Sequence, residues 1–365
     1  MASFRGGVAA LVLIAACLSG PSSAAQPGSP EKAASPVIAD WSTLKIGLKR
    51  TACYGGCPVY DVEIAGDGTV TYNGRAFVAL SGTHVAHIPP EAVQGLFATF
   101  AKADFLGALD SYRAHITDQP TFTVTLAFDG HAKQVVDYAG KRIGMPAVIS
   151  ELEAAIDAAA GTARWVKPSK DPFALLQAEG WDFSVTDDDH LGLLVTAAKQ
   201  GDAAFLGKLL AAGVDARSNL GCQALVAAAY KRNAAMVDAL LQAGAPVQSA
   251  APKGEDSKRC AALDAAAGSG MVGIVQAVLA RHPDIDAENL SGTTAHMQAA
   301  DLSDFGSSGG RDYAAVMAAL LAAGADPRHA DKVGRTALDI ASRSPASEAA
   351  AEVLKRWMDT HPKGQ

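Results

Sequence analysis

The sequence of 365 residues lacks any long apolar run beyond its first residues. The longest run, Val8 to Leu18, covers roughly 11 residues, whereas a transmembrane helix needs about 20. The sequence also lacks an excess of basic residues, since its formal net charge is −7. We therefore expect no membrane-spanning helix in the mature chain and no nucleic-acid partner.

Motifs for catalysis and for metal binding are missing as well. No nucleophile stands in a recognised elbow, no glycine-rich phosphate loop opens a helix, and no further cysteine pair or H-x-x-x-H completes a zinc site. We expect no catalytic residue, no metal and no cofactor. One alternative stays open, a periplasmic enzyme or small-ligand binder with its site in the N-terminal domain. Its candidate residues are Tyr60, His84, His87, Asp118 and His131, and only a bulge brings His84 and His87 to the same face of a strand.

The N-terminus has the features of a secretory signal. Arg5 precedes the apolar run, and Ser22 to Ala25 supply small residues for cleavage, so we expect residues 1–25 to be a signal peptide. Ile14 to Cys17 also resembles a lipobox, in which case the signal ends before Cys17 and this cysteine is lipidated. Residues 26–40, rich in Pro, Ser and Ala, are expected to be a disordered linker. The protein is thus expected in the periplasm or lipid-anchored at the envelope, with contact to a membrane only through that anchor.

Residues 41–165 alternate as strands and helices. Val59 to Ile64 and Thr69 to Asn73 surround a Gly-Asp-Gly turn, and a second hairpin is expected at residues 121–138. A further strand is expected from Arg75 to His87. Helices are expected from Pro89 to Phe100 and from Pro146 to Ala159. This order predicts an α+β domain, an antiparallel sheet with two helices on one face.

Three motifs of this domain carry a resemblance to a known family. They are C-x-x-x-C-P-x-Y at residues 53–60, D-G-T-V-x-Y-x-G at residues 67–74, and T-D-x-P at residues 117–120. Together they resemble a bacterial domain of unknown function, family 6438, over roughly residues 42 to 140. The resemblance implies no activity, because none is assigned to the family.

The second half of the sequence is repetitive. An apolar segment recurs at Leu194, Leu225, Leu263, His296 and Leu338, in steps of 31, 38, 33 and 42 residues. Residues 331–341, D-K-V-G-R-T-A-L-D-I-A, are similar to the ankyrin motif D-x-x-G-x-T-P-L-H-x-A. The steps between the recurring segments are close to the ankyrin period of about 33 residues or longer than it. The resemblance implies an all-α ankyrin-repeat solenoid over residues 171–358, an N-terminal half-repeat plus about five repeats, followed by a tail at 359–365. The two long steps place insertions around Gln248 to Lys258 and Asp301 to Arg311.

Export determines how the cysteines are interpreted. Without Cys17 an even number remains, which favours disulfides in an oxidising compartment. The glycines between Cys53 and Cys57 allow a tight turn, so we expect a disulfide there, with a reduced, metal-binding or redox pair as alternatives. Cys222 and Cys260 hold equivalent positions in successive repeats. A bridge between them is predicted if the insertion displaces one repeat, because stacked helices otherwise lie about 8–10 Å apart.

Ankyrin arrays bind other proteins, so the resemblance implies an interaction protein with an unidentified protein partner and no enzymatic activity. We expect this exported protein to be monomeric. We expect contacts on the hairpins and the ends of the first helices. The candidates are Asn219, Tyr230, Arg232, Asn289, Lys332 and Arg335.

Overall fold

The computed structural model describes residues 37–249, 260–301, 311–343 and 345–362. The predicted signal peptide, Cys17 and most of the predicted linker lie outside these ranges, as do most of both predicted insertions and the last three residues of the predicted tail. Within the described ranges, no helix is both long enough and apolar enough to cross a bilayer.

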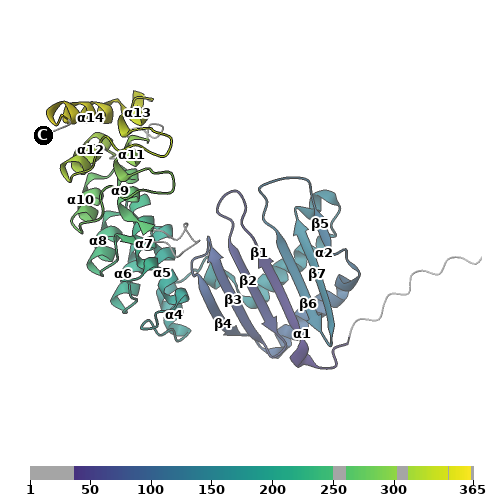
Figure 1. Cartoon of the computed structure of the whole chain (residues 1–365). Coiled ribbons are helices and arrows are strands. Elements are labelled where there is room, and N and C mark those ends of the chain that lie inside the picture. Colours follow the sequence, from purple (N-terminus) through teal and green to yellow (C-terminus); the bar gives the residue numbers. More distant parts are fainter. Residues whose placement is uncertain (1–36, 250–259, 302–310, 344, 363–365) are drawn as a thin grey trace, which may run out of the picture. The chain divides into compact units, whose positions relative to one another are not determined.

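The N-terminal domain contains a seven-stranded sheet with the order β4-β3-β2-β1-β6-β7-β5 (Figure 1). Both predicted hairpins are confirmed, as β2–β3 and β6–β7. The strands are β1 (Lys45–Arg50), β2 (Val59–Ala65), β3 (Thr69–Ala76), β4 (Gly82–His87), β5 (Ser111–Arg113), β6 (Phe122–Phe128) and β7 (His131–Tyr138).

The sheet is larger than predicted, and it is mixed, so the prediction of a purely antiparallel sheet was wrong. Strand β5 pairs parallel with β7 at the edge of the sheet. Its three residues are too few to show an alternating pattern, which is why the sequence did not reveal it. The segment from Arg75 to His87 is also not one strand, because a loop at residues 77–81 separates β3 from β4.

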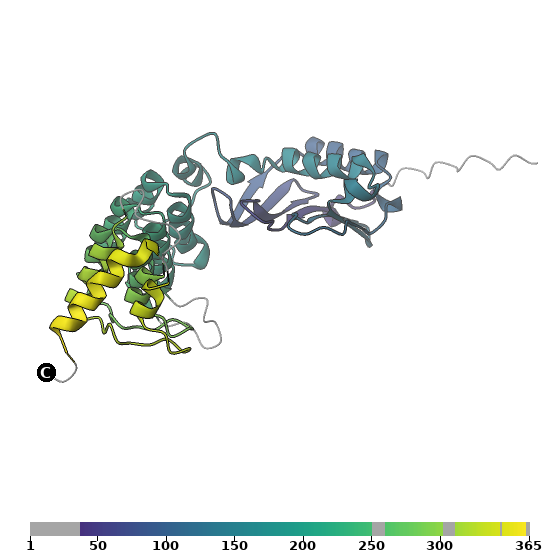
Figure 2. The same cartoon turned by 90° about the horizontal axis from the view of Figure 1, so that it is seen from above.

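Helices α1 (Pro90–Lys102) and α2 (Ala147–Ala160) cover one face of this sheet (Figure 2). Helix α1 buries one apolar face, whose residues recur at helical spacing: Val93, Leu96, Phe97 and Phe100. The opposite face of the sheet carries exposed polar side chains such as Lys45, Glu63 and Thr71, as is common for antiparallel sheets. Short elements complete the domain: η1 (Trp41–Thr43), η2 (Phe105–Gly107), η3 (Gly140–Ile143) and α3 (Ala163–Val166).

In its described residues, the C-terminal region consists of helices and one short ribbon. In chain order the helices are α4 (Pro172–Ala178), α5 (Asp188–Gln200), α6 (Ala203–Ala211), α7 (Asn219–Tyr230), α8 (Ala234–Gln242), α9 (Ala262–Ser269), α10 (Val272–Leu279), α11 (Ala295–Ala300), α12 (Tyr313–Ala322), α13 (Ala337–Ala341), η6 (Pro345–Ser347) and α14 (Glu348–Thr360). The ribbon pairs β8 (Gln248–Ser249) with β9 (Cys260–Ala261).

The helices form two rows. The odd-numbered helices α5 to α13 contact one another in succession, and so do the even-numbered helices α6 to α14. Buried alanines, among them Ala197, Ala228 and Ala266, allow the helices to approach closely. Gly213, Gly244 and Gly324 have positive φ just after α6, α8 and α12, and His282 takes the same conformation after α10.

A disulfide joins two neighbouring units of this region. Cys222 lies in α7 and Cys260 in β9, with their Cα atoms 6.1 Å apart. The predicted bridge is therefore present, and the position of Cys260 explains how the two sulfurs come within bonding distance. Cys260 belongs to the ribbon that precedes α9 and not to the helix itself, so the helix-to-helix spacing does not keep the two sulfurs apart.

A partly buried carboxylate, that of Glu179, connects the sheet to the helices. Glu179, just after α4, accepts hydrogen bonds from His84 Nδ1 at 2.8 Å, from Trp165 Nε1 at 2.7 Å and from Trp181 Nε1 at 3.2 Å. His84 is 1% exposed and its other ring nitrogen lies 3.2 Å from the carbonyl oxygen of Ser81. This cluster fixes β4 and the end of the N-terminal domain to the segment that follows α4.

Candidate partner-binding groove

The loop between β3 and β4 is held firmly in place by its neighbours. The N–H groups of Ala79 and Leu80 donate to the carbonyl oxygens of Val166 and Trp165, at 3.1 and 2.9 Å. These bonds join the loop to the chain at α3. A loop whose backbone groups are paired in this way presents its exposed side chains in a defined position.

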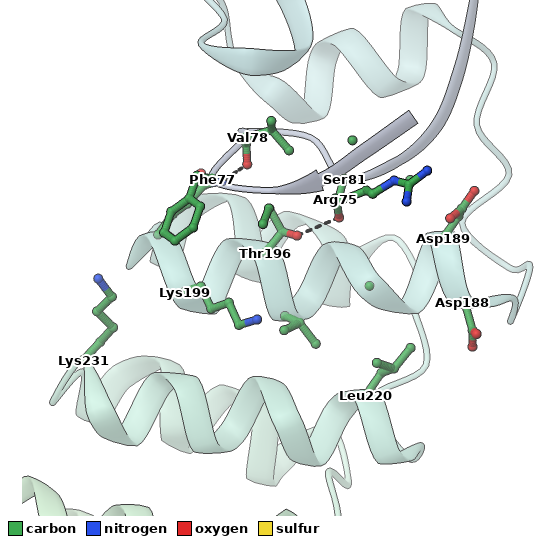
Figure 3. Close-up of a pocket in the computed structure, with 16 residues that line it drawn as sticks. Arg75, Phe77, Val78, Ser81, Asp188, Asp189, Thr196, Lys199, Leu220 and Lys231 are labelled. Atoms are coloured by element: carbon green, nitrogen blue, oxygen red, sulfur yellow. Dashed lines mark hydrogen bonds between the residues drawn. The ribbon is translucent and has the colours of Figure 1, made fainter. Parts of the chain in front are cut away.

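Helix α5 holds the same loop from the other side. Gln200 Nε2 donates to the carbonyl oxygen of Val78 at 2.6 Å, and the hydroxyls of Ser81 and Thr196 lie 2.6 Å apart (Figure 3). The sheet and the helical region thus both determine the conformation of the loop.

Phe77 stands out in this loop. Its backbone has φ +54°, a left-handed conformation that a bulky residue adopts only at a cost of about 1–3 kcal/mol, and its side chain is 59% exposed. Neither burial of the ring nor backbone preference accounts for a phenylalanine at this position. Strain of this kind concentrates at functional sites, which makes Phe77 a candidate contact residue.

A cavity of about 650 Å³ opens beside Phe77. The β3–β4 loop forms one side of it, and helices α5 and α7 form the other (Figure 3). The lining residues are Gly74, Arg75, Ala76, Phe77, Val78, Ser81, Gly82, Asp188, Asp189, Gly192, Val195, Thr196, Lys199, Gln200, Leu220 and Lys231. Both halves of the chain therefore contribute to this cavity.

Two further cavities continue from the first along the helices. One of about 360 Å³ shares Lys199 and Lys231 with the first cavity, and one of about 390 Å³ shares Val226 and Tyr230 with the second. We call the three together the groove. Phe77, Tyr230 and Leu290 are 59%, 60% and 63% exposed along it, so large apolar side chains occur from one end to the other.

The residues predicted as partner contacts divide into two groups. Tyr230 and Asn289 line the groove, and Arg232 follows α7 with φ +57°. Arg232 and the other three lie outside the cavity linings: Asn219 is the first residue of α7, and Lys332 and Arg335 lie between α12 and α13.

Three of these polar side chains hold the fold together. Asn289 Oδ1 accepts from the N–H groups of Ser291 and Thr293, Lys332 Nζ donates to the carbonyl oxygen of Leu290, and Arg335 pairs with Asp331 at 2.7 Å. The side chain of Asn219 likewise accepts a hydrogen bond from Ser249.

Sequence reasoning missed Phe77, Lys199, Lys231 and Leu290. For Phe77 a signal was present, because a strand from Arg75 to His87 exceeds the usual upper length of about 10 residues. The Ser81-Gly82 pair also marks a break in such a strand. An exposed aromatic residue beside that break points to a loop with a binding role.

The residues of the alternative site do not converge. His84 is buried against Glu179, whereas His87 is exposed on the other face of β4, and the register between β3 and β4 runs without a bulge. The bulge that the alternative required is therefore not formed. Across the residues that the structure describes, no three His, Cys, Asp or Glu side chains gather as they would around a metal ion.

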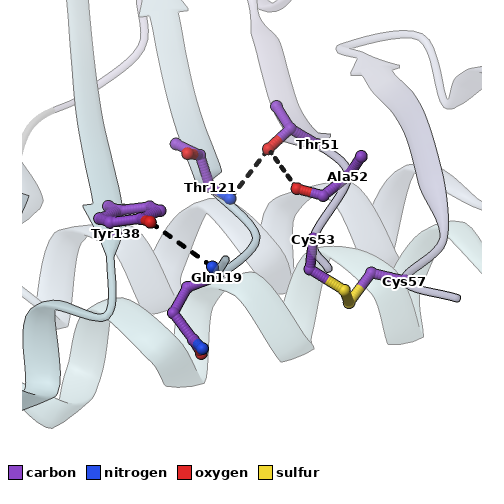
Figure 4. The surroundings of a disulfide bond; sticks show 7 residues. All are labelled: Thr51, Ala52, Cys53, Cys57, Gln119, Thr121 and Tyr138. Atoms are coloured by element: carbon purple, nitrogen blue, oxygen red, sulfur yellow. Dashed lines mark hydrogen bonds between the residues drawn. A yellow bond between two sulfur atoms is a disulfide. The ribbon is translucent and has the colours of Figure 1, made fainter. Parts of the chain in front are cut away.

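Cys53 and Cys57 form a disulfide with a Cα–Cα distance of 5.6 Å (Figure 4). The bridged loop joins β1 to β2 and leads into a strand, not into a helix whose N-terminus would activate a thiol. The N–H of Thr121 donates to the hydroxyl of Thr51 at 2.9 Å and ties the neighbouring loop to β1 (Figure 4). These surroundings indicate that the disulfide has a structural role, holding the turn between β1 and β2. With the second bridge, it indicates an oxidising, exported environment.

A buried polar cluster lies under α2. Tyr60 donates to Asp157 at 2.5 Å, and Arg50 donates to the hydroxyl of Tyr60 at 3.0 Å. Glu153, 7% exposed, lies near Asp137, and burial together with that neighbouring carboxylate raises the pKa of Glu153 to about 8. None of the cavities described above reaches this cluster.

The raised pKa of Glu153 gives a pH-dependent prediction. Because the pKa of Glu153 is higher in the folded state, protonation of this side chain stabilises the folded protein. This contribution is complete below the unfolded pKa of about 4.5 and is lost as the pH rises through about 8. Glu153→Gln should therefore match the wild type at pH 5 and exceed its free energy of unfolding by about 1–3 kcal/mol at pH 9. Urea unfolding at both values measures this, with Glu151→Gln on the exposed side of α2 as the control. A difference between wild type and Glu153→Gln that stays constant with pH would contradict the assignment.

Comparison with known families matches residues 44–160 to a domain of unknown function, DUF6438. The match runs from the start of β1 to the end of α2, so it extends beyond the region that the motifs suggested. No ankyrin family is detected in the helical region. None of the curated proteins compared with the chain matches it.

Proposed function

We propose that this protein, which carries a DUF6438 domain at residues 44–160, is an exported interaction protein whose groove binds an extended segment of a partner protein. In this proposal the helical region acts as a divergent ankyrin array, and the DUF6438 domain adds Phe77 to its binding surface. The activity is binding, without catalysis.

The continuity of the groove carries the proposal. Successive cavities share lining residues, and the exposed apolar side chains occur at intervals along them. An extended polypeptide places side chains in successive pockets in this way, and large aromatic anchors account for much of the binding energy at such interfaces.

The alternation of two helical rows supports the ankyrin interpretation. Each unit is a helix pair that cannot bury its apolar face alone, and stacking of units produces one continuous core. Within the helical region, the residues that line the groove come from the first helices, α5, α7, α9 and α11, and from the segments next to them.

Site-specific photo-crosslinking tests the proposal directly. A benzophenone amino acid is placed at position 77, at 290 or, as a control outside the groove, at 54, where Tyr54 is 88% exposed. We expect positions 77 and 290 to crosslink one and the same protein from an envelope extract, and position 54 not to do so. Equal crosslinking at position 54 would contradict the proposed location.

Affinity measurement with that partner follows. Phe77→Asn keeps a residue that tolerates positive φ, so it should fold normally while lowering affinity at least about tenfold. Tyr230→Ala should have a similar effect, and Tyr54→Ala should change affinity less than about twofold. Unchanged binding by both groove variants would overturn the proposed function.

A further inference from the structure

Two lysines give the middle of the groove its charge. Lys199 lies in the last turn of α5 and Lys231 directly follows α7, and both side chains are exposed. Both line the first cavity together with Phe77 (Figure 3), and both line the second cavity together with Tyr230. In the described part of the chain, neither amino group forms an ion pair or a hydrogen bond, so both are available to a ligand.

The other charged residues of the first cavity contrast with these lysines. Arg75 pairs with Asp61 at 2.6 Å, and Asp189 accepts a hydrogen bond from the N–H of Thr83 at 2.9 Å. Asp188 lies at the far end of the cavity, in the first turn of α5. Acidic residues thus stand toward the ends of the groove, with Asp264 in the third cavity, and the available positive charge is central.

We propose that the groove selects a partner segment with a central Asp or Glu between two large apolar side chains. This inference rests on the proposed function and specifies its ligand. The carboxylate lies between the amino groups of Lys199 and Lys231, while the apolar side chains contact Phe77 on one side and Tyr230 with Leu290 on the other. Charge complementarity determines which segment binds, and the apolar contacts hold it.

Both lysines stand at helix C-termini, where the carbonyl dipoles favour a basic side chain over an acidic one. A central lysine in the ligand meets two like charges, which excludes basic segments.

Three labelled peptides of equal length test the selection. Each has leucines in its outer thirds and, in its centre, two Glu, two Gln or two Lys residues, and binding to the mature, disulfide-intact chain is followed by fluorescence anisotropy. We expect the Glu peptide to bind at least tenfold more tightly than the Lys peptide, with the Gln peptide between them. Raising the salt from 50 to 500 mM should reduce this preference.

A charge reversal provides the decisive variant. In the double variant Lys199→Glu with Lys231→Glu, the order should invert, so that the Lys peptide binds more tightly than the Glu peptide. The matched control, Lys102→Glu with Lys355→Glu, changes the net charge equally at exposed positions outside the groove and should keep the original order. Inversion cannot result from misfolding, because one peptide gains affinity.

The outcomes distinguish failure of the acidic selection from failure of the proposed protein-binding function. Equal binding of the Glu and Gln peptides would overturn the selection while leaving the groove as a protein-binding site, provided that crosslinking at positions 77 and 290 succeeds. If no peptide binds but laurate quenches a fluorophore in the groove, the site takes small anionic amphiphiles and the inference is wrong. Failure of both peptide binding and crosslinking would refute the proposed function as well.

Discussion

Replacing Cys222 and Cys260 together by alanine should lower the free energy of unfolding by about 4 kcal/mol. The bridge spans 38 residues, and in the chain-entropy model a loop of that length restricts the unfolded chain by about this amount. Both cysteines are buried, so alanine introduces no polar group. Chemical denaturation of the double variant and of the wild type measures the difference.

The second disulfide is the matched control. Its loop closes over a separation of four residues, so Cys53→Ala with Cys57→Ala should cost only about 2 kcal/mol. If the two double variants lose equal stability, loop length does not determine the effect, and the bridge between α7 and β9 contributes less to the helical region than its position suggests.

Glu179→Ala should destabilise the protein by about 3–5 kcal/mol. The change removes the shared acceptor of His84, Trp165 and Trp181, and leaves two buried donors and one partly buried donor unpaired. Glu288 offers a comparison of the same chemistry, because it lies 3.6 Å from His329 but is half exposed. Glu288→Ala should cost at most about 1 kcal/mol. Thermal or urea unfolding distinguishes the two, and equal losses would refute the structural importance of Glu179.

The same carboxylate makes stability sensitive to acid. Burial raises the pKa of Glu179, but the hydrogen bonds from His84, Trp165 and Trp181 lower this pKa by a larger amount. The pKa of Glu179 therefore lies below its usual value. Its contribution is complete above the unfolded pKa of about 4.5 and is lost as the pH falls through the lower folded value. The advantage of the wild type over Glu179→Gln should accordingly shrink as the pH falls from 7 to 3.

Local patterns in the sequence predicted much of the fold. The Gly-Asp-Gly turn, the proline at the start of α1 and the recurring leucines each depend on neighbours close in the chain, and the structure has the hairpins and helices that they predicted. Strand β5 was not predictable in this way, because it forms through pairing with a distant strand and has no pattern of its own. The glycines after α6, α8 and α12 likewise serve a local need, because positive φ favours glycine strongly.

The groove was harder to predict, since it depends on contacts between distant segments. Phe77 and Lys199 lie 122 positions apart in the sequence and meet only because Gln200 and Thr196 hold the β3–β4 loop. Conversely, Lys332 and Arg335 were chosen by residue type, and the structure shows that their side chains bond to nearby groups. Residue type alone does not distinguish a side chain that supports a turn from one that is available to a ligand.

The hydrogen bonds of Val78, Ala79 and Leu80 affect where this protein can be cut into fragments that fold independently. The DUF6438 match ends at residue 160, yet the loop at residues 77–81 is held by Trp165, Val166 and two side chains of α5. A fragment cut at the end of the family match would lose these supports and expose the apolar surface around His84 and Tyr72. The boundary recognised in sequence is therefore not the boundary of independent folding, and exchanging the helical region for another would also alter the shape of the loop that carries Phe77.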